Sequence, residues 1–300
     1  MKNKKLVYII LLFVAITSAL ALTAVRTIAL IDEFDASIGY YAHDAVFPSV
    51  FTWGAVAVVI VIFIVTFIIR RPLDSVNQDS DSGAIIFSAA LMAFMIIAVL
   101  ISDIFSLNGT PGTFTLITMI FAFPAALYPL VGVALPIKSK NGKIILSAFL
   151  MLWLFAVTLN IYFADGVAIN NPNRALELSA VACYLFFFVN ECRYNVGTAK
   201  GWSYIAFGLS SVVIGGIYCL PNIVLALMKL YPDTLNFTFE LVICVIWIYI
   251  LMRMCVHAAD LDEDEEEEED ADEGNDDNVA IVKSEQEALD EQKEAHQETI

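Results

Sequence analysis

Charged residues are scarce in this sequence. Asp, Glu, Lys and Arg make up 16% of its 300 residues, against about 25% in ordinary soluble domains. Hydrophobic residues make up 59%, against about 45–50% in soluble domains. A water-soluble fold of this length could not bury so much apolar surface, so the composition excludes an ordinary soluble domain.

The residues that usually carry catalysis are also few. The only histidines are His43, His257 and His296, and the sequence has no H-E-x-x-H, G-x-S-x-G or glycine-rich phosphate-binding motif. The five cysteines form no C-x-x-C pair and no Cys/His spacing typical of a metal site. We therefore expect no enzyme, no metal site and no cofactor.

Long apolar runs are the dominant feature of the chain. A bilayer core of about 30 Å needs about 20 mostly apolar residues for each helix. Eight runs meet this requirement, at 6–27, 47–69, 84–102, 113–135, 144–164, 178–195, 202–228 and 239–256. The sequence therefore predicts an all-α polytopic membrane protein, a bundle of about eight transmembrane helices. Small residues such as Gly208, Gly215 and Gly216 are expected at the helix contacts.

The basic residues predict the orientation of this bundle. With the N-terminus inside, 11 of the 14 Lys and Arg residues before position 260 fall on the cytoplasmic side, as the positive-inside rule requires. Both termini are then cytoplasmic, in a multi-pass protein of the cell membrane. An alternative stays open for the first helix, because the small-x-small pattern at Ala19 and Ala21 resembles a signal-peptidase site. Cleavage there would leave seven helices.

The C-terminal segment has a different composition. Residues 260–300 hold 20 of the 33 acidic residues and only 2 of the 16 basic ones. Like charges at this density repel one another, and the segment has too few apolar residues to form a core. We therefore predict two regions, a transmembrane domain at 1–259 and a disordered acidic cytoplasmic tail at 260–300. The tail either attracts a basic cytoplasmic protein or only solvates the membrane domain.

Polar residues near the end of the sixth run form the first candidate site. Asn190, Glu191 and Arg193 follow a run of phenylalanines. They are interpreted either as an ion or proton site, or as an interfacial cluster that reaches headgroups and water. Glu191 and Arg193 are two residues apart and are not expected to pair.

Prolines inside two of the runs predict kinks. Pro124 and Pro129 lie in the fourth run, and Pro221 lies in the seventh, next to Asn222. A proline removes a backbone hydrogen bond, so Asn222 and the released carbonyls could form part of a binding site. The alternative is that the helix only bends to fit the bilayer.

Three further polar features have simpler interpretations. Arg26 is expected to extend to the membrane interface, with Glu33 or Asp103 as a possible counter-charge. Asn160 is expected to form an interhelical hydrogen bond. The acidic segment 32–44 is expected to be a solvated loop rather than a site for a divalent ion.

The sequence favours a non-enzymatic membrane scaffold, accessory or regulatory component whose acidic tail binds a partner. The alternative is a small-solute or ion transporter or channel that uses the sixth and seventh helices. The first is favoured because the ionisable residues fall at predicted helix ends, whereas transporters need some near the midplane. The expected partners are the lipid bilayer and a basic cytoplasmic protein, and no nucleic acid. The oligomeric state stays open.

Overall fold

The computed structural model describes residues 3–35, 39–70, 82–106, 112–135, 140–163, 171–196, 198, 200–230 and 237–258. Apart from one short hairpin, the described elements are all helical. The hairpin pairs strand β1 (Phe34–Asp35) with strand β2 (Tyr40–Tyr41) in antiparallel fashion. The predicted acidic tail at 260–300 lies outside the described residues.

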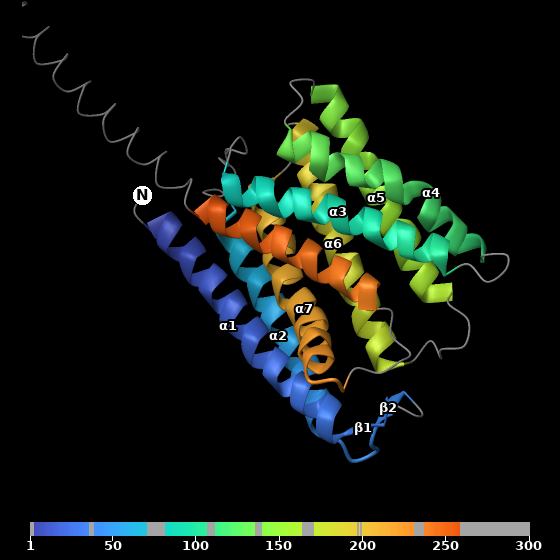
Figure 1. Cartoon of the computed structure of the whole chain (residues 1–300). Helices are drawn as coiled ribbons and strands as arrows, with labels where there is room; N and C mark the ends of the chain where they lie inside the picture. The colour runs from blue at the N-terminus through green and yellow to red at the C-terminus, as the bar shows by residue number, and fades with distance from the viewer. Residues whose placement is uncertain are drawn as a thin grey trace, which may run out of the picture. The chain divides into compact units, whose positions relative to one another are not determined.

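The described part of the chain contains eight helices long and apolar enough to span a membrane, which confirms the predicted number of spans. The chain is therefore a multi-pass membrane protein. In chain order the helices are α1 (Asn3–Asp32), α2 (Phe47–Ile68), α3 (Gly83–Phe105), α4 (Thr113–Leu127), the π-helical η2 (Tyr128–Ala134), α5 (Lys140–Phe163), α6 (Pro172–Val196) and α7 (Gly201–Leu227). The last helix spans Phe237–Ala258 and has no label in Figure 1.

The start of α6 differs most from the sequence prediction, because the helix begins six residues earlier than expected. Asn171 caps it: the side-chain Oδ1 accepts hydrogen bonds from the backbone N–H groups of Asn173 (2.9 Å) and Arg174 (3.2 Å). Pro172 follows as the first helical residue, where proline is favoured. As a result, Arg174 and Glu177 lie inside the helix rather than in a loop.

Helix α7 is the central element of the bundle. In the most apolar 18-residue stretch of α7, 72% of the residues are buried, whereas the corresponding share in α2 is 22%. It packs against α1, α2 and α6, while α3, α4 and α5 form a neighbouring group that joins it through α6. Figure 1 shows these two groups, with α1, α2 and α7 on one side and α4 and α5 on the other.

Glycines on α7 allow close helix contacts, as predicted. A Cβ atom on Gly208 would meet the thioether of Met254 on the last helix, and one on Gly215 would meet the hydroxyl of Tyr184 on α6. One on Gly216 would lie 3.3 Å from the Cβ of Ala19 on α1. Three helices therefore approach the α7 backbone where a side chain would keep them apart.

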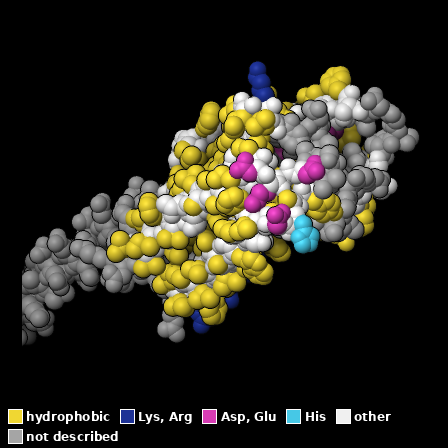
Figure 2. All heavy atoms as spheres, turned by 90° about the horizontal axis from the view of Figure 1, so that it is seen from below, with side chains coloured by type: hydrophobic (Ala, Val, Ile, Leu, Met, Phe, Trp, Pro, Cys, Tyr) yellow, Lys and Arg dark blue, Asp and Glu magenta, His cyan; other side chains and the backbone are white. Residues whose placement is uncertain are grey.

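Large apolar side chains cover the outside of the helices. Trp53 and Phe87 are each 71% exposed and Phe105 is 85% exposed, as expected for side chains that face lipid. Figure 2 shows hydrophobic side chains over much of the visible surface, with Asp and Glu side chains and one His gathered on the face turned to the viewer.

The proline-containing end of the fourth span is a π-helix. Pro124 lies inside α4 and Pro129 lies in the first turn of η2. The N–H of Leu135 donates to the carbonyl of Leu130, five residues earlier, at 2.9 Å. The chain therefore stays helical past both prolines, and its turns widen only from Tyr128 onward. Such turns often occur at functional sites.

Candidate functional site

One buried polar cluster forms where Pro221 interrupts the hydrogen bonding of α7. The helix continues through this proline, but Pro221 has no N–H to donate to the carbonyl of Ile217, four residues earlier. Arg26 of α1 supplies the missing donor. Its Nη1 atom donates to the carbonyls of Ile217 (2.7 Å) and Tyr218 (2.6 Å). Because an unsatisfied carbonyl in hydrocarbon costs several kcal/mol, Pro221 and Arg26 act as a pair.

The Arg26 side chain is buried, with only 1% of its surface exposed. Its Nη2 atom lies 3.4 Å from the side-chain oxygens of both Asn173 and Asn222. In the described part of the chain, no carboxylate forms an ion pair with it. The expectation that Arg26 extends to the interface beside Glu33 or Asp103 is therefore wrong. A set of polar acceptors on α6 and α7 holds it inside the bundle instead.

Glu33 has a different role, as a cap for α2. Its two carboxylate oxygens accept hydrogen bonds from the backbone N–H groups of Val46 (3.3 Å) and Phe47 (3.2 Å). A carboxylate at this position also interacts favourably with the helix dipole.

Glu240 of the last helix completes this cluster. Its Oε1 accepts a hydrogen bond from the Tyr218 hydroxyl at 2.6 Å, and its Oε2 accepts one from the Asn222 amide at 2.9 Å. The side chain is buried, and both of its donors come from α7. The Asn222 amide therefore bridges opposite charges, with its oxygen facing Arg26 and its nitrogen facing Glu240. We call Arg26, Asn173, Tyr218, Asn222 and Glu240 the Arg26 cluster.

The β hairpin lies against the same end of the bundle. Asn171 donates from its side chain to the carbonyl of Gly39 at 2.8 Å, which ties the hairpin to the start of α6. Gly39 has a φ of +74° and leaves no room for a Cβ beside that amide. On β2, burial raises the pKa of the Tyr41 hydroxyl, and the nearby charge of Arg26 opposes the shift. The hairpin therefore covers the Arg26 cluster from outside the spans.

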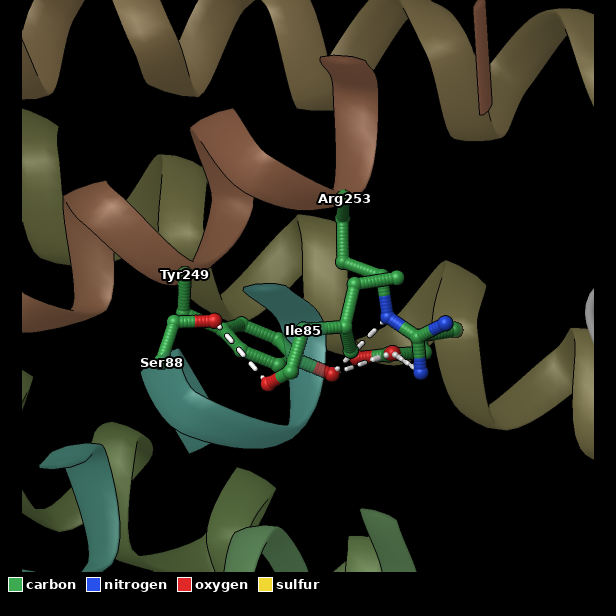
Figure 3. A network of polar contacts seen from close by, with 5 residues as sticks. Ile85, Ser88, Tyr249 and Arg253 are labelled. Carbon is green, nitrogen blue, oxygen red and sulfur yellow. Dashed lines mark hydrogen bonds and ion pairs between the residues drawn. The ribbon is translucent and has the colours of Figure 1, made fainter. Parts of the chain in front are cut away.

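A second buried cluster lies toward the other end of α6. Glu191 is 1% exposed, and its Oε1 lies 3.2 Å from Nη2 of Arg253. The Tyr249 hydroxyl donates to the same carboxylate oxygen at 2.8 Å and accepts from Nε of Arg253 at 3.1 Å. Tyr249 and Arg253 are four residues apart and share one face of the last helix. Figure 3 shows their side chains meeting, in a view that includes Ser88 and Ile85 of α3. We call Glu191, Tyr249 and Arg253 the Arg253 cluster.

The π-helical turn contributes to this second cluster. Tyr128, the first residue of η2, lies beside the Glu191 carboxylate. His257 is also buried nearby, with its ring 5.3 Å from that of Tyr8 and 6.4 Å from that of Tyr204. Aromatic side chains from four helices therefore surround this end of the site.

The four site residues named from the sequence fall in different places. Glu191 belongs to the Arg253 cluster and Asn222 to the Arg26 cluster. Asn190 accepts a hydrogen bond from Ser203 of α7 at 2.9 Å and so joins two helices. Arg193 is exposed and lies 3.5 Å from the carbonyl of Thr198, which agrees with the expectation that it does not pair with Glu191. The structure thus separates these residues into two sites.

No family model, curated protein or solved structure matches this chain.

The two clusters lie at different levels along the same helices, as two binding sites on one path for an ion would. Glu240 and Tyr249 are nine residues apart on the last helix, which corresponds to about 14 Å. Each cluster contains a carboxylate that accepts hydrogen bonds from tyrosine and sits in a medium where an ionised group is expensive. Such a carboxylate can take up a proton or another positive charge and release it again.

Sequence reasoning missed several members of these clusters. Glu240, Arg253, Tyr218 and Tyr249 were not singled out as site residues. Two spacings in the sequence could have indicated these contacts, because Tyr218 precedes Asn222 by four residues and Tyr249 precedes Arg253 by four. Each pair therefore shares a helix face.

Proposed function

We propose that this chain is an ion transporter whose path lies among α6, α7 and the last helix. Glu240 and Glu191 are the carboxylates that take up the ion. The observation that carries the proposal is their burial between helices, at 2% and 1% exposure. Ionisable groups inside a membrane bundle are rare and usually functional, because keeping them there is costly.

This proposal favours the transport alternative over the scaffold. The sequence ranking relied on ionisable residues lying at helix ends, where headgroups and water can reach them. Arg26, Glu191 and Glu240 are instead almost fully buried. A scaffold does not need charges in such positions, whereas ion transport does.

The arrangement around Glu240 supports ion uptake in particular. Its hydrogen-bond donors, Tyr218 and Asn222, are both neutral. The nearest positive charge, on Arg26, is held by carbonyl oxygens and reaches Glu240 only through the Asn222 amide. Among the described residues Glu240 therefore has no direct ion pair, and its carboxylate can take up a transported cation.

The proposed orientation places the Arg26 cluster on the outer side and the Arg253 cluster on the cytoplasmic side of the cell membrane. The excess of Lys and Arg on the segments assigned to the cytoplasm supports it. An ion that passes from one cluster to the other would then cross about half of the hydrocarbon core.

Ion flux in vesicles tests this proposal. The full chain is reconstituted in lipid vesicles, and uptake of H⁺, Na⁺ and K⁺ is followed separately under imposed gradients. We expect flux of one of these ions above that of empty vesicles, and a fall of at least about tenfold in Glu240→Gln, comparable to the loss of a proton-transfer group. Asp44→Asn, at an exposed carboxylate outside the helices, is the matched control.

Two results would overturn the proposal. The first is a wild-type flux equal to that of empty vesicles for all three ions. The second is a flux that Glu240→Gln leaves unchanged.

A second function, partner binding by the tail, is favoured by one separate observation. Residues 260–300 carry a net charge of −18, since they hold 20 acidic and 2 basic residues. We propose that this segment attracts a basic cytoplasmic protein. Cross-linked co-purification from native membranes, with the full chain and with one truncated after Ala259, tests it. A basic protein lost with the tail supports the proposal, and an unchanged set of partners contradicts it.

A further inference from the structure

One face of α6 carries three polar residues at equal intervals. Glu177, Tyr184 and Glu191 are seven residues apart, and residues at this spacing stay aligned to within about 20° per step. Each interval corresponds to about 10.5 Å along the helix. Glu177 is within electrostatic range of Glu240 of the Arg26 cluster, and Glu191 belongs to the Arg253 cluster. Tyr184 therefore lies midway between the levels of the two clusters.

The Tyr184 hydroxyl is an unusual group at this depth. The side chain is fully buried, and within the described residues its oxygen has no hydrogen-bond partner. Buried tyrosine hydroxyls nearly always have a partner. Leaving one unsatisfied is destabilising, so this position is suited to a transient partner such as a water molecule.

Gly215 on α7 provides the room for this hydroxyl. A Cβ atom at Gly215 would collide with the Tyr184 oxygen and would lie 2.9 Å from Cδ1 of Trp247 on the last helix. The hydroxyl thus points to the place where α6, α7 and the last helix meet. Any larger residue at position 215 would displace it.

Titratable groups of both clusters lie around this point. Glu240, with Cys183, Cys219 and Cys244, is within electrostatic range of the Tyr184 hydroxyl. Toward the other end, Tyr204 is within range of Glu191, Tyr249, Arg253 and Tyr8. The Tyr184 hydroxyl is therefore electrostatically linked to Glu240, and the Tyr204 hydroxyl to Glu191.

The donors around each carboxylate indicate which ion the path carries. Glu240 faces the O–H of Tyr218 and the N–H of Asn222, and Glu191 faces the O–H of Tyr249 and the guanidinium of Arg253. A metal cation needs several oxygen lone pairs directed at it, whereas these groups direct hydrogens. A proton needs only one free lone pair on the carboxylate.

We propose that the transported ion is the proton and that the Tyr184 hydroxyl relays it between Glu240 and Glu191 with the help of water. This inference depends on the proposed ion transport. A hydroxyl can donate and accept at the same time. Its oxygen accepts a proton from water on the Glu240 side and releases its own proton to water on the Glu191 side. One O–H bond forms for each one that breaks, and no electrons are transferred.

The variant Tyr184→Phe tests this relay. It keeps the ring and removes an oxygen that has no hydrogen bond to lose, so the variant should fold. Proton uptake into vesicles is driven by a K⁺ diffusion potential and followed with an entrapped pH-sensitive dye. We expect the proton flux to fall at least about tenfold, with an unchanged unfolding midpoint in detergent.

The matched control is Tyr162→Phe. Tyr162 lies on α5, is 45% exposed and belongs to neither cluster, so this variant should keep its proton flux. Equal losses in Tyr184→Phe and Tyr162→Phe would overturn the relay.

The possible outcomes separate this inference from the function on which it depends. Proton flux that needs Glu240 but survives Tyr184→Phe overturns the relay and leaves transport intact. Flux of Na⁺ or K⁺ without protons overturns the proton assignment and with it the relay, and leaves ion transport intact. No flux of any ion in the wild type overturns both. If Tyr184→Phe fails to fold, wild-type flux in H₂O and D₂O decides: slower flux in D₂O supports the relay, and equal flux contradicts it.

Discussion

The two clusters hold their arginines in different ways. Arg253 forms an ion pair with Glu191 at 3.2 Å, and its side chain keeps 14% of its surface exposed. Arg26 is 1% exposed and is held by the carbonyls of Ile217 and Tyr218 instead of by a carboxylate. In one cluster the opposite charges cancel directly. In the other, an amide keeps them apart.

This difference has an energetic consequence. Removing the charge of Arg253 leaves the Glu191 carboxylate without its ion pair, but this carboxylate keeps its hydrogen bond from Tyr249. Removing Arg26 leaves the Ile217 carbonyl without a donor, takes one donor from the Tyr218 carbonyl and removes the positive charge nearest Glu240. The Arg26 cluster should therefore be the more sensitive to substitution, and the comparison can be tested by removing each arginine in turn.

Arg26→Met should have the largest effect. Methionine keeps most of the apolar stem but leaves the Ile217 carbonyl without a donor. We expect the free energy of unfolding to fall by about 3–5 kcal/mol, as when one partner of a buried charged network is removed. Reversible unfolding in mixed detergent micelles measures it. Arg193→Met, on an exposed side chain, should change the value by no more than about 0.5 kcal/mol.

A second substitution shows whether the freed carbonyl is the cause. In Arg26→Met/Pro221→Ala, the new N–H at position 221 can donate to the Ile217 carbonyl. We expect the double variant to regain about 1 kcal/mol relative to Arg26→Met alone, the worth of one hydrogen bond. If alanine at position 221 brings no recovery, the pairing of Pro221 with Arg26 is refuted.

Arg253→Met should have a smaller effect, because this arginine is partly exposed. We expect a loss of about 1–3 kcal/mol, since the Glu191 carboxylate stays buried but keeps one hydrogen bond. Adding Glu191→Gln should recover part of the loss by removing the unpaired charge. The same unfolding assay measures the cycle. A loss as large as that of Arg26→Met would remove the distinction between the clusters.

The spans could be predicted from the sequence, whereas the clusters could not. Span length depends on the bilayer, so eight apolar runs were enough to identify eight helices. The partners of Arg26 depend on how distant helices pack, and its acceptor carbonyl lies 191 residues away along the chain. Pro221 indicated that a carbonyl would be released, but nothing in the sequence indicated which donor would reach it.

Some polar predictions succeeded because they needed only a neighbouring helix. Asn160 of α5 accepts a hydrogen bond from Thr115 of α4 at 3.0 Å, which confirms the predicted interhelical bond. Helices α4 and α5 follow one another in the chain and pack together. A short connection leaves few choices of partner, in contrast to the case of Arg26.

The same Thr115 bond gives the smallest expected effect and a baseline for both clusters. Thr115→Val keeps the shape of the side chain and removes the donor. Neutral interhelical hydrogen bonds in membrane bundles average about 0.6 kcal/mol, so the loss in the unfolding assay should be close to that value. Asn160 is only partly buried and can turn its oxygen to another donor, which keeps the effect small. A loss of several kcal/mol here would mean that any polar contact between helices is as costly to break as those of Arg26. The special role of the carbonyl-bound arginine would then have no support.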